Sequence, residues 1–160
     1  IPELVQQLAD KLLAKKLIIS TAESCTGGWI SQSLTALAGS SVWFDTGFVT
    51  YSNEAKQRLL AVPAAIFDSD GAGAVSEATV LAMTAGAIQN SRANLAVAVS
   101  GIAGPDGGTE EKPVGTVWIA WCVDQRAEAR CYAFPGDRAA VREATIVAAL
   151  EGLLARLEED

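Results

Sequence analysis

Apolar residues recur along the chain with two different periods, and together these periods predict a series of helices and strands. The helical period is clearest near the start, where Leu4, Leu8 and Leu12 fall on one face. Apolar stripes, with a capping residue in some cases, predict helices over 3–15, 27–37, 53–60, 76–90 and from a cap at Asp137 onward. Apolar or β-branched runs predict strands over 17–21, 43–52, 93–100, 115–122 and 128–134.

The order of these elements predicts the architecture. The series αβαβα followed by αββα is typical of an α/β protein in which helices cover a central sheet. A short polar turn joins the last two strands, so we expect a hairpin and therefore a mixed sheet. We predict a three-layer α/β/α sandwich with a mixed central sheet, formed by a single domain over residues 1–160. Residues 63–75, rich in Pro and Gly, predict mainly loop.

The composition limits the partners and the location. The formal net charge is −7, which repels a phosphate backbone and argues against general nucleic-acid binding. The longest apolar runs, such as 95–99, are far too short to span a bilayer, so we expect no membrane partner. The three cysteines are odd in number, and no export signal is visible, which favours a reduced cytoplasmic setting. Apolar helix faces could form a homodimer.

The chain contains no histidine, which is the most informative feature of its composition. This absence excludes Ser-His-Asp and Cys-His catalysis within the chain and removes the commonest transition-metal ligand. Acid–base chemistry must therefore fall to Lys, Asp, Glu, Tyr, Cys, a terminus or a bound cofactor. The acidic residues match no metal-ligand spacing, so we predict no metal site; they are Asp68, Asp70, Asp106, Glu110 and Glu111.

The segment from Thr21 to Gly28 leads from a strand into a helix through a turn of small residues. Unpaired backbone N–H groups at such a helix start can hold an oxyanion. Ser24 could attack a carbonyl carbon while the N–H of Cys25 or Thr26 binds the developing charge. A helix cap formed by Ser24 or Thr26 explains the same local pattern and is the commoner role of such residues.

A second segment ends in Lys56, one turn inside the helix that begins at Asn53. An ordinary lysine has a pKa near ~10.4, so only about one in 2,500 is neutral at pH 7. Burial in an apolar pocket could lower that pKa and make the lysine a general base. The same residue could also be an ordinary exposed lysine.

The third segment, residues 100–109, is a glycine-rich loop at the end of a strand. Its glycines allow close approach of a ligand and can form a nest of N–H groups for an anion; they are Gly101, Gly104, Gly107 and Gly108. Arg138, at the start of the last helix, could bind a phosphate or could be an ordinary surface arginine.

Together these segments resemble the CinA C-terminal domain family, which comprises nicotinamide-nucleotide amidases. The motifs are Thr-Ala-Glu-Ser-Cys-Thr-Gly-Gly, Gly-Phe-Val-Thr-Tyr-Ser-Asn-Glu-Ala-Lys, Gly-Ala-Val-Ser-Glu, Ser-Gly-Ile-Ala-Gly-Pro-Asp-Gly-Gly, Lys-Pro-Val-Gly-Thr-Val and Gly-Asp-Arg. The resemblance covers nearly the whole chain. It implies an α/β/α fold and a small-molecule nucleotide substrate, nicotinamide mononucleotide (NMN), whose carboxamide is hydrolysed to nicotinate mononucleotide and ammonia without a metal or other cofactor.

Carried onto this sequence, the resemblance implies that Ser24 is the nucleophile, Lys56 the base and Tyr51 an assisting hydroxyl. It also implies a set of substrate-binding residues: Glu23, Cys25, Thr26, Gly27, Gly101, Gly104, Gly107, Gly108 and Arg138. One departure is Ala72, which stands where family members often carry a histidine.

Other functions fit parts of the same pattern. The chain could be a non-catalytic nucleotide-binding or regulatory module of the same fold. It could also be a metal-dependent phosphohydrolase that uses the acidic loops, or Cys25 could be the nucleophile in place of Ser24.

Overall fold

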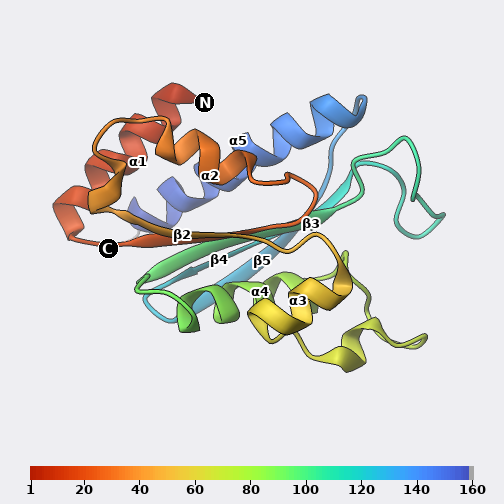
Figure 1. Ribbon diagram of the computed structural model, residues 1–160. Coiled ribbons are helices and arrows are strands. Elements are labelled where there is room, and N and C mark those ends of the chain that lie inside the picture. The colour runs from red at the N-terminus through yellow and green to blue at the C-terminus, as the bar shows by residue number, and fades with distance from the viewer. Residues whose placement is uncertain (159–160) are drawn as a thin grey trace.

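The computed structural model describes residues 1–158 and shows a sheet between two layers of helices (Figure 1). The strands are β1 Ile19–Glu23, β2 Phe44–Val49, β3 Leu95–Gly101, β4 Thr116–Val123 and β5 Arg126–Ala133. On one side lie α1 Pro2–Lys15, α2 Trp29–Thr35 and α5 Arg138–Glu158, and on the other lie α3 Asn53–Leu60 and α4 Glu77–Gln89. Short 3-10 turns cover Ser40–Val42 and Ala64–Phe67. Residues 159 and 160, the end of the predicted domain, lie outside the described residues.

The sheet is mixed, as the sequence predicted. Its strand order is β2-β1-β3-β4-β5, with β2, β1 and β3 parallel and β4 antiparallel to β3. The hairpin of β4 and β5 is closed by Asp124 and Gln125, both with positive φ, of 51° and 65°. A two-residue turn of this handedness matches the twist of the strands that it joins. The predicted three-layer α/β/α sandwich is therefore confirmed.

The two faces of the sheet carry side chains of different size. Alternate residues of β3 point to opposite faces, so Leu95, Val97 and Val99 join the core beneath α1, α2 and α5. Ala96 and Ala98 face the other way, toward α4. The α4 side is therefore lined largely by alanines of the sheet, which allow a close approach of that helix.

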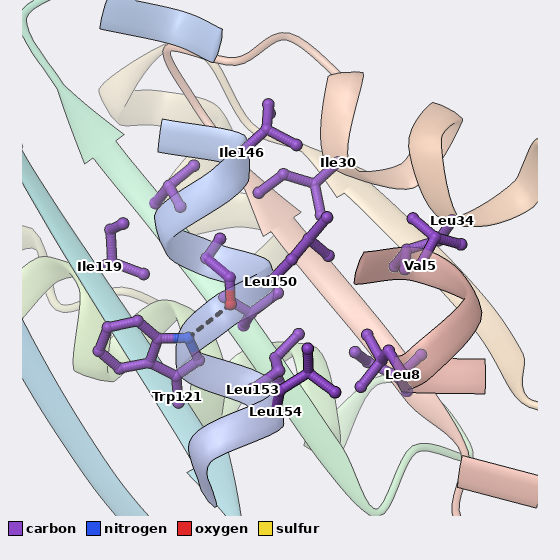
Figure 2. Close-up of a cluster of buried hydrophobic side chains, with 14 of the residues drawn as sticks. Val5, Leu8, Ile30, Leu34, Ile119, Trp121, Ile146, Leu150, Leu153 and Leu154 are labelled. Carbon is purple, nitrogen blue, oxygen red and sulfur yellow. Dashed lines mark hydrogen bonds between the residues drawn. The ribbon is translucent and has the colours of Figure 1, made fainter. Parts of the chain in front are cut away.

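Trp121 of β4 anchors the larger of the two cores (Figure 2). Its indole is fully buried, and its Nε1–H donates to the carbonyl oxygen of Ala149 in α5 at 2.9 Å. A buried indole N–H needs such an acceptor, because an unpaired one costs the desolvation energy of the group. The bond therefore joins α5 to strand β4 of the sheet.

The main difference from the predicted elements is at β1, which covers residues 19–23 rather than 17–21. The prediction followed the apolar residues, whereas the strand extends into polar ones. Strand β1 is paired on both sides, and its buried polar side chains find partners: the hydroxyl of Ser20 bonds to Ser91 and that of Thr21 to Ser31. The predicted helices and their capping residues agree better with the structure. Ser76 and Asp137, both predicted as caps, accept hydrogen bonds from N–H groups at the starts of α4 and α5.

Helix α3 packs on α4 at a point where only glycine fits. A Cβ at Gly86 would lie 2.1 Å from the carbonyl oxygen of Leu60, the last residue of α3. Replacing glycine by alanine inside a helix ordinarily adds about 1 kcal/mol of stability. For Gly86→Ala we expect the opposite, a loss of roughly 1–3 kcal/mol in the free energy of unfolding, because the helices must separate.

Urea denaturation followed by circular dichroism measures this change. Gln89→Ala is the control, since Gln89 is an exposed residue of the same helix and its change should stay within about 0.5 kcal/mol. A gain in stability for Gly86→Ala would show that the packing of α3 on α4 does not require a glycine at this position.

Candidate active site

The carboxyl ends of the three parallel strands meet at one edge of the sheet, and a cleft opens there. Ser24 directly follows β1, Tyr51 lies just beyond β2, and Gly101 ends β3. The cleft has a volume of about 250 Å³, slightly below the ~300–1,000 Å³ that is usual for small-molecule sites. Parallel α/β sheets bind ligands at this edge because the loops that follow the strands surround it.

Ser24 and Lys56 lie in direct contact at the floor of this cleft. Lys56 Nζ is 3.0 Å from Ser24 Oγ, and it donates to the carbonyl oxygens of Thr50 at 2.9 Å and Tyr51 at 3.0 Å. The lysine is 1% exposed although it is the fourth residue past the cap of a surface helix. Ser52 caps that helix by accepting from the N–H of Ala55, which fixes the turn from which Lys56 projects.

Burial changes the acidity of this lysine. Desolvation lowers the pKa of Lys56 from 10.5 to about 8, because the ammonium loses its water shell. Within residues 1–158 no carboxylate forms an ion pair with Lys56 that would reverse this effect. At pH 7, about one such lysine in ten is neutral, so a usable fraction carries a free lone pair.

Glu23, not Ser24, serves the start of α2. The carboxylate of Glu23 accepts from the N–H groups of Ile30 and Ser31, the second and third residues of α2, at 2.8 and 3.0 Å. It also accepts from the hydroxyls of Thr26 at 2.6 Å and Ser31 at 2.9 Å. These are the N–H groups that a capping side chain ordinarily satisfies. The helix-cap interpretation of Ser24 and Thr26 is therefore wrong, and Ser24 Oγ is left to face Lys56.

Comparison with known proteins identifies the family of the chain. Residues 2–157 match the CinA C-terminal domain. The chain belongs to that family. It is 51% identical to the nicotinamide-nucleotide amidohydrolase PncC of Pseudomonas putida over 96% of this chain and 95% of that protein. It is 50% identical to the PncC of Escherichia coli K12 over 94% of this chain and 91% of that protein.

Longer relatives and solved structures extend the comparison. A CinA-like protein of Colwellia psychrerythraea is 46% identical over 98% of this chain but only 36% of its own length. The crystal structure of a competence damage-inducible protein A from Klebsiella pneumoniae matches with a TM-score of 0.94 at 40% identity, over 99% of this chain and 97% of that one. The crystal structure of the competence/damage inducible protein CihA from Agrobacterium tumefaciens matches with a TM-score of 0.93 at 44% identity, over 99% of this chain and 95% of that one.

Not all predicted site residues of this CinA domain face the cleft. Those that line it are Ser24, Cys25, Tyr51, Lys56, Gly101, Gly104, Gly107 and Arg138. Glu23, Thr26, Gly27 and Gly108 are not among the lining residues. Glu23, at the end of β1, and Thr26, in the turn after Ser24, are fully buried, and Gly27 continues that turn with a φ of 60°. Direct binding of substrate by these four residues stays a prediction.

Tyr51 and Arg138 form a pair on the rim. An Nη2–H of Arg138 donates to the hydroxyl of Tyr51 at 3.1 Å, and Nη1 donates to the carbonyl of Gly104 at 2.9 Å. The guanidinium therefore joins α5 to the glycine loop. Tyr51 is 60% exposed, and its backbone carbonyl, rather than its hydroxyl, contacts Lys56.

Cys25 lines the cleft beside Ser24, but its thiol is poorly activated. Burial raises the pKa of Cys25 to about 11, and the charge of Glu23 adds to this effect against opposing hydrogen bonds and Arg142. At neutral pH the residue is a thiol, which is a weak nucleophile compared with a thiolate. The side chain that contacts Lys56 Nζ is that of Ser24, not that of Cys25.

The predicted set of site residues omitted several that line the cleft, although the segments singled out in the sequence contain them. These include Asn53, Ala74, Val75, Ser100, Ile102 and Asp106. The divergent position Ala72 lies in an exposed loop, and its carbonyl accepts from Lys112 Nζ at 2.7 Å.

The helices of residues 1–158 include none with the length and apolarity to cross a bilayer.

The role of Glu23 leads to a stability prediction. In Glu23→Gln the amide NH₂ would face some of the four donors that now meet the carboxylate. We expect a loss of roughly 1–3 kcal/mol in the free energy of unfolding, the cost of buried donors without an acceptor. Urea denaturation measures it.

Glu77→Gln is the matched control. Glu77 is the exposed first residue of α4, where only the helix dipole favours its charge, so the loss should stay below ~1 kcal/mol. Equal losses in the two variants would mean that Glu23 contributes no more than an exposed helix-end charge.

Proposed function

We propose that this chain hydrolyses the carboxamide of nicotinamide mononucleotide to nicotinate mononucleotide and ammonia, with Ser24 as nucleophile and Lys56 as base. The observation that carries the proposal is the 3.0 Å contact between Ser24 Oγ and the buried Lys56 Nζ in the cleft. The names of the relatives from Pseudomonas putida and Escherichia coli, nicotinamide-nucleotide amidohydrolases, support the choice of substrate.

The first step is activation of the serine. A neutral amine has two N–H bonds and one lone pair, and the carbonyls of Thr50 and Tyr51 take up the two N–H bonds. The lone pair is thereby directed toward Ser24 Oγ. As Oγ attacks the carboxamide carbon, its proton passes to Lys56 Nζ, which becomes an ammonium.

The tetrahedral intermediate carries its negative charge on the former carbonyl oxygen. The backbone N–H groups of Cys25 and Thr26 directly follow the nucleophile, and no hydrogen bond within residues 1–158 assigns them to another residue's acceptor. They are the candidate oxyanion donors. When the intermediate collapses, the C–N bond breaks, the Lys56 ammonium returns a proton to the leaving nitrogen, and ammonia departs.

Water completes the cycle. The resulting ester of Ser24 is attacked by a water molecule whose proton is taken by the again neutral Lys56. Collapse of the second intermediate breaks the ester C–O bond, the proton returns to Ser24 Oγ, and nicotinate mononucleotide is released. The overall reaction consumes one water for each ammonia formed.

The remainder of the cleft suits the nucleotide part of the substrate. Arg138 lies on the rim as an exposed cation, and the glycine loop to which it is bonded allows backbone to lie close to the ligand. A phosphate held there would place the pyridine ring deeper in the cleft, toward Ser24.

The dyad predicts a loss of ammonia release from NMN when either residue is removed. We expect Ser24→Ala to lower kcat by roughly 10⁴-fold or more and Lys56→Met to lower it by at least about 10²-fold. The double variant should be little worse than the more severe single variant, because the two residues act as a unit. Lys11→Met, at a half-buried position of α1 that does not line the cleft, should retain full activity. Substantial turnover in Ser24→Ala would exclude the mechanism.

The lowered pKa predicts the pH dependence of the reaction. The neutral form of Lys56 is the base, so kcat/KM should rise about tenfold per pH unit below pH 8 and level off above it, following the pKa of about 8. Initial rates of ammonia release between pH 6.5 and 9.5 measure the profile. A rate that is flat or falls across this range would contradict a lysine base.

A further inference from the structure

Arg142 of α5 reaches across to the turn that carries the nucleophile. Its Nε–H donates to the carbonyl oxygen of Cys25, and its Nη2–H donates to that of Thr26, both at 3.1 Å. Its guanidinium carbon also lies 5.6 Å from the ring centroid of Trp29, the first residue of α2. Arg142 does not line the cleft, so its contacts are with the protein backbone behind the site.

These two bonds fix the orientation of two successive peptide units. The C=O and N–H of a trans peptide point in opposite directions. With the carbonyl of Cys25 turned toward Arg142, the N–H of Thr26 must point away from it. The carbonyl of Thr26 accepts from Arg142 and also from the N–H of Trp29 at 3.0 Å, and the N–H of Gly27 on the opposite side of that peptide donates to the carbonyl of Ser24 at 3.0 Å.

Loss of these bonds would free the peptide between Cys25 and Thr26 to rotate. This rotation changes ψ of Cys25 and φ of Thr26, and within residues 1–158 no other hydrogen bond holds the carbonyl of Cys25. A rotated peptide would present its carbonyl oxygen in the direction now occupied by the N–H of Thr26. An oxyanion would then meet a negative dipole in place of a donor. A hydrogen bond to the carbonyl also polarises the peptide and strengthens its N–H as a donor.

We propose that Arg142 is a positioning residue that holds the backbone donors of the oxyanion site in place. It acts from behind the turn, by two bonds to the carbonyls of Cys25 and Thr26. Glu23 holds the same turn from the other side, through Thr26 and the start of α2. The inference rests on the proposed function, since it assigns Arg142 to the same Ser24 reaction.

Arg156 provides a matched control within the same helix. It also donates to a backbone carbonyl, that of Gly152 at 3.1 Å, and its guanidinium carbon lies 3.9 Å from the ring centroid of Trp121. Arg156 belongs to the far end of α5 and contacts Glu128 rather than the Ser24 turn. Both arginines therefore stabilise structure through comparable contacts, but only Arg142 touches the residues beside the nucleophile.

The experiment compares Arg142→Met, Arg142→Lys and Arg156→Met with the parent protein by two measurements. One is kcat and KM for ammonia release from NMN. The other is the rate at which a fluorophosphonate probe labels Ser24, followed by mass spectrometry, since the phosphoryl oxygen of the probe uses the same donors whatever the natural substrate. Thermal unfolding shows that each variant is folded.

We expect Arg142→Met to lower kcat and the labelling rate by at least about tenfold, with KM little changed. The effect should stay below or near the ~10²–10³-fold that loss of one oxyanion donor causes, because the peptide still visits its active orientation. Arg142→Lys should lose less, since its ammonium can still reach a carbonyl. The pH at which kcat/KM levels off should be that of the parent, since no bond of Lys56 is altered.

Three results would overturn the inference: unchanged kcat and labelling in Arg142→Met, a fall in Arg156→Met as large as that in Arg142→Met, or a change confined to KM. If the parent protein labels at Ser24 but does not release ammonia from NMN, the proposed substrate is wrong. Slower labelling in Arg142→Met would still support the positioning role in that case.

Discussion

The burial of the Lys56 amine against Ser24 is the constraint on which the rest of the site depends. A buried ammonium is costly unless an anion or several acceptors surround it. Here two backbone carbonyls and the serine hydroxyl surround Nζ, and none of the ion pairs in the described part of the chain involves this lysine. These partners can also accept the N–H bonds of a neutral amine, and burial, which removes the water shell of the ammonium, lowers the pKa of Lys56.

A carboxylate beside Lys56 would remove this property, since an opposite charge raises the pKa of a lysine. The chain carries a buried carboxylate directly before the nucleophile, at Glu23, yet it is directed to the opposite layer. Neighbouring residues at the end of a strand point to opposite faces of the sheet. Glu23 therefore faces α2 and Ser24 faces α3, and these helices lie on opposite sides in Figure 1. The sheet therefore separates the carboxylate of Glu23 from the amine of Lys56, although Ser24, the residue next to Glu23, contacts that amine.

Much of the fold was predictable because periodic apolar stripes and caps are local signals. The placement of Lys56 one turn inside a helix followed from Asn53 and the strand before it, and the choice of Ser24 with Lys56 came from the family resemblance. The limits of β1 were less predictable, because a central strand can hold buried Ser and Thr once other segments supply partners. The role of Glu23 could not be predicted, since its acceptor geometry depends on a turn that returns α2 over the strand. Arg142 lies 117 residues from Cys25, and only the tertiary fold brings them together.

The small side chains on one face of the sheet complete this argument. A lysine side chain is short compared with the width of a helix layer, so α3 must lie close to the strand ends for Nζ to reach Ser24. Helix α3 packs on α4, and α4 packs on alanines at Ala96, Ala98 and Ala120. Gly86 lets the carbonyl of Leu60 approach α4 without a side chain between them. Larger residues at these positions would move both helices outward and lengthen the contact between the base and the nucleophile. The core beneath α3 and α4 is therefore part of what sets the geometry of the reaction.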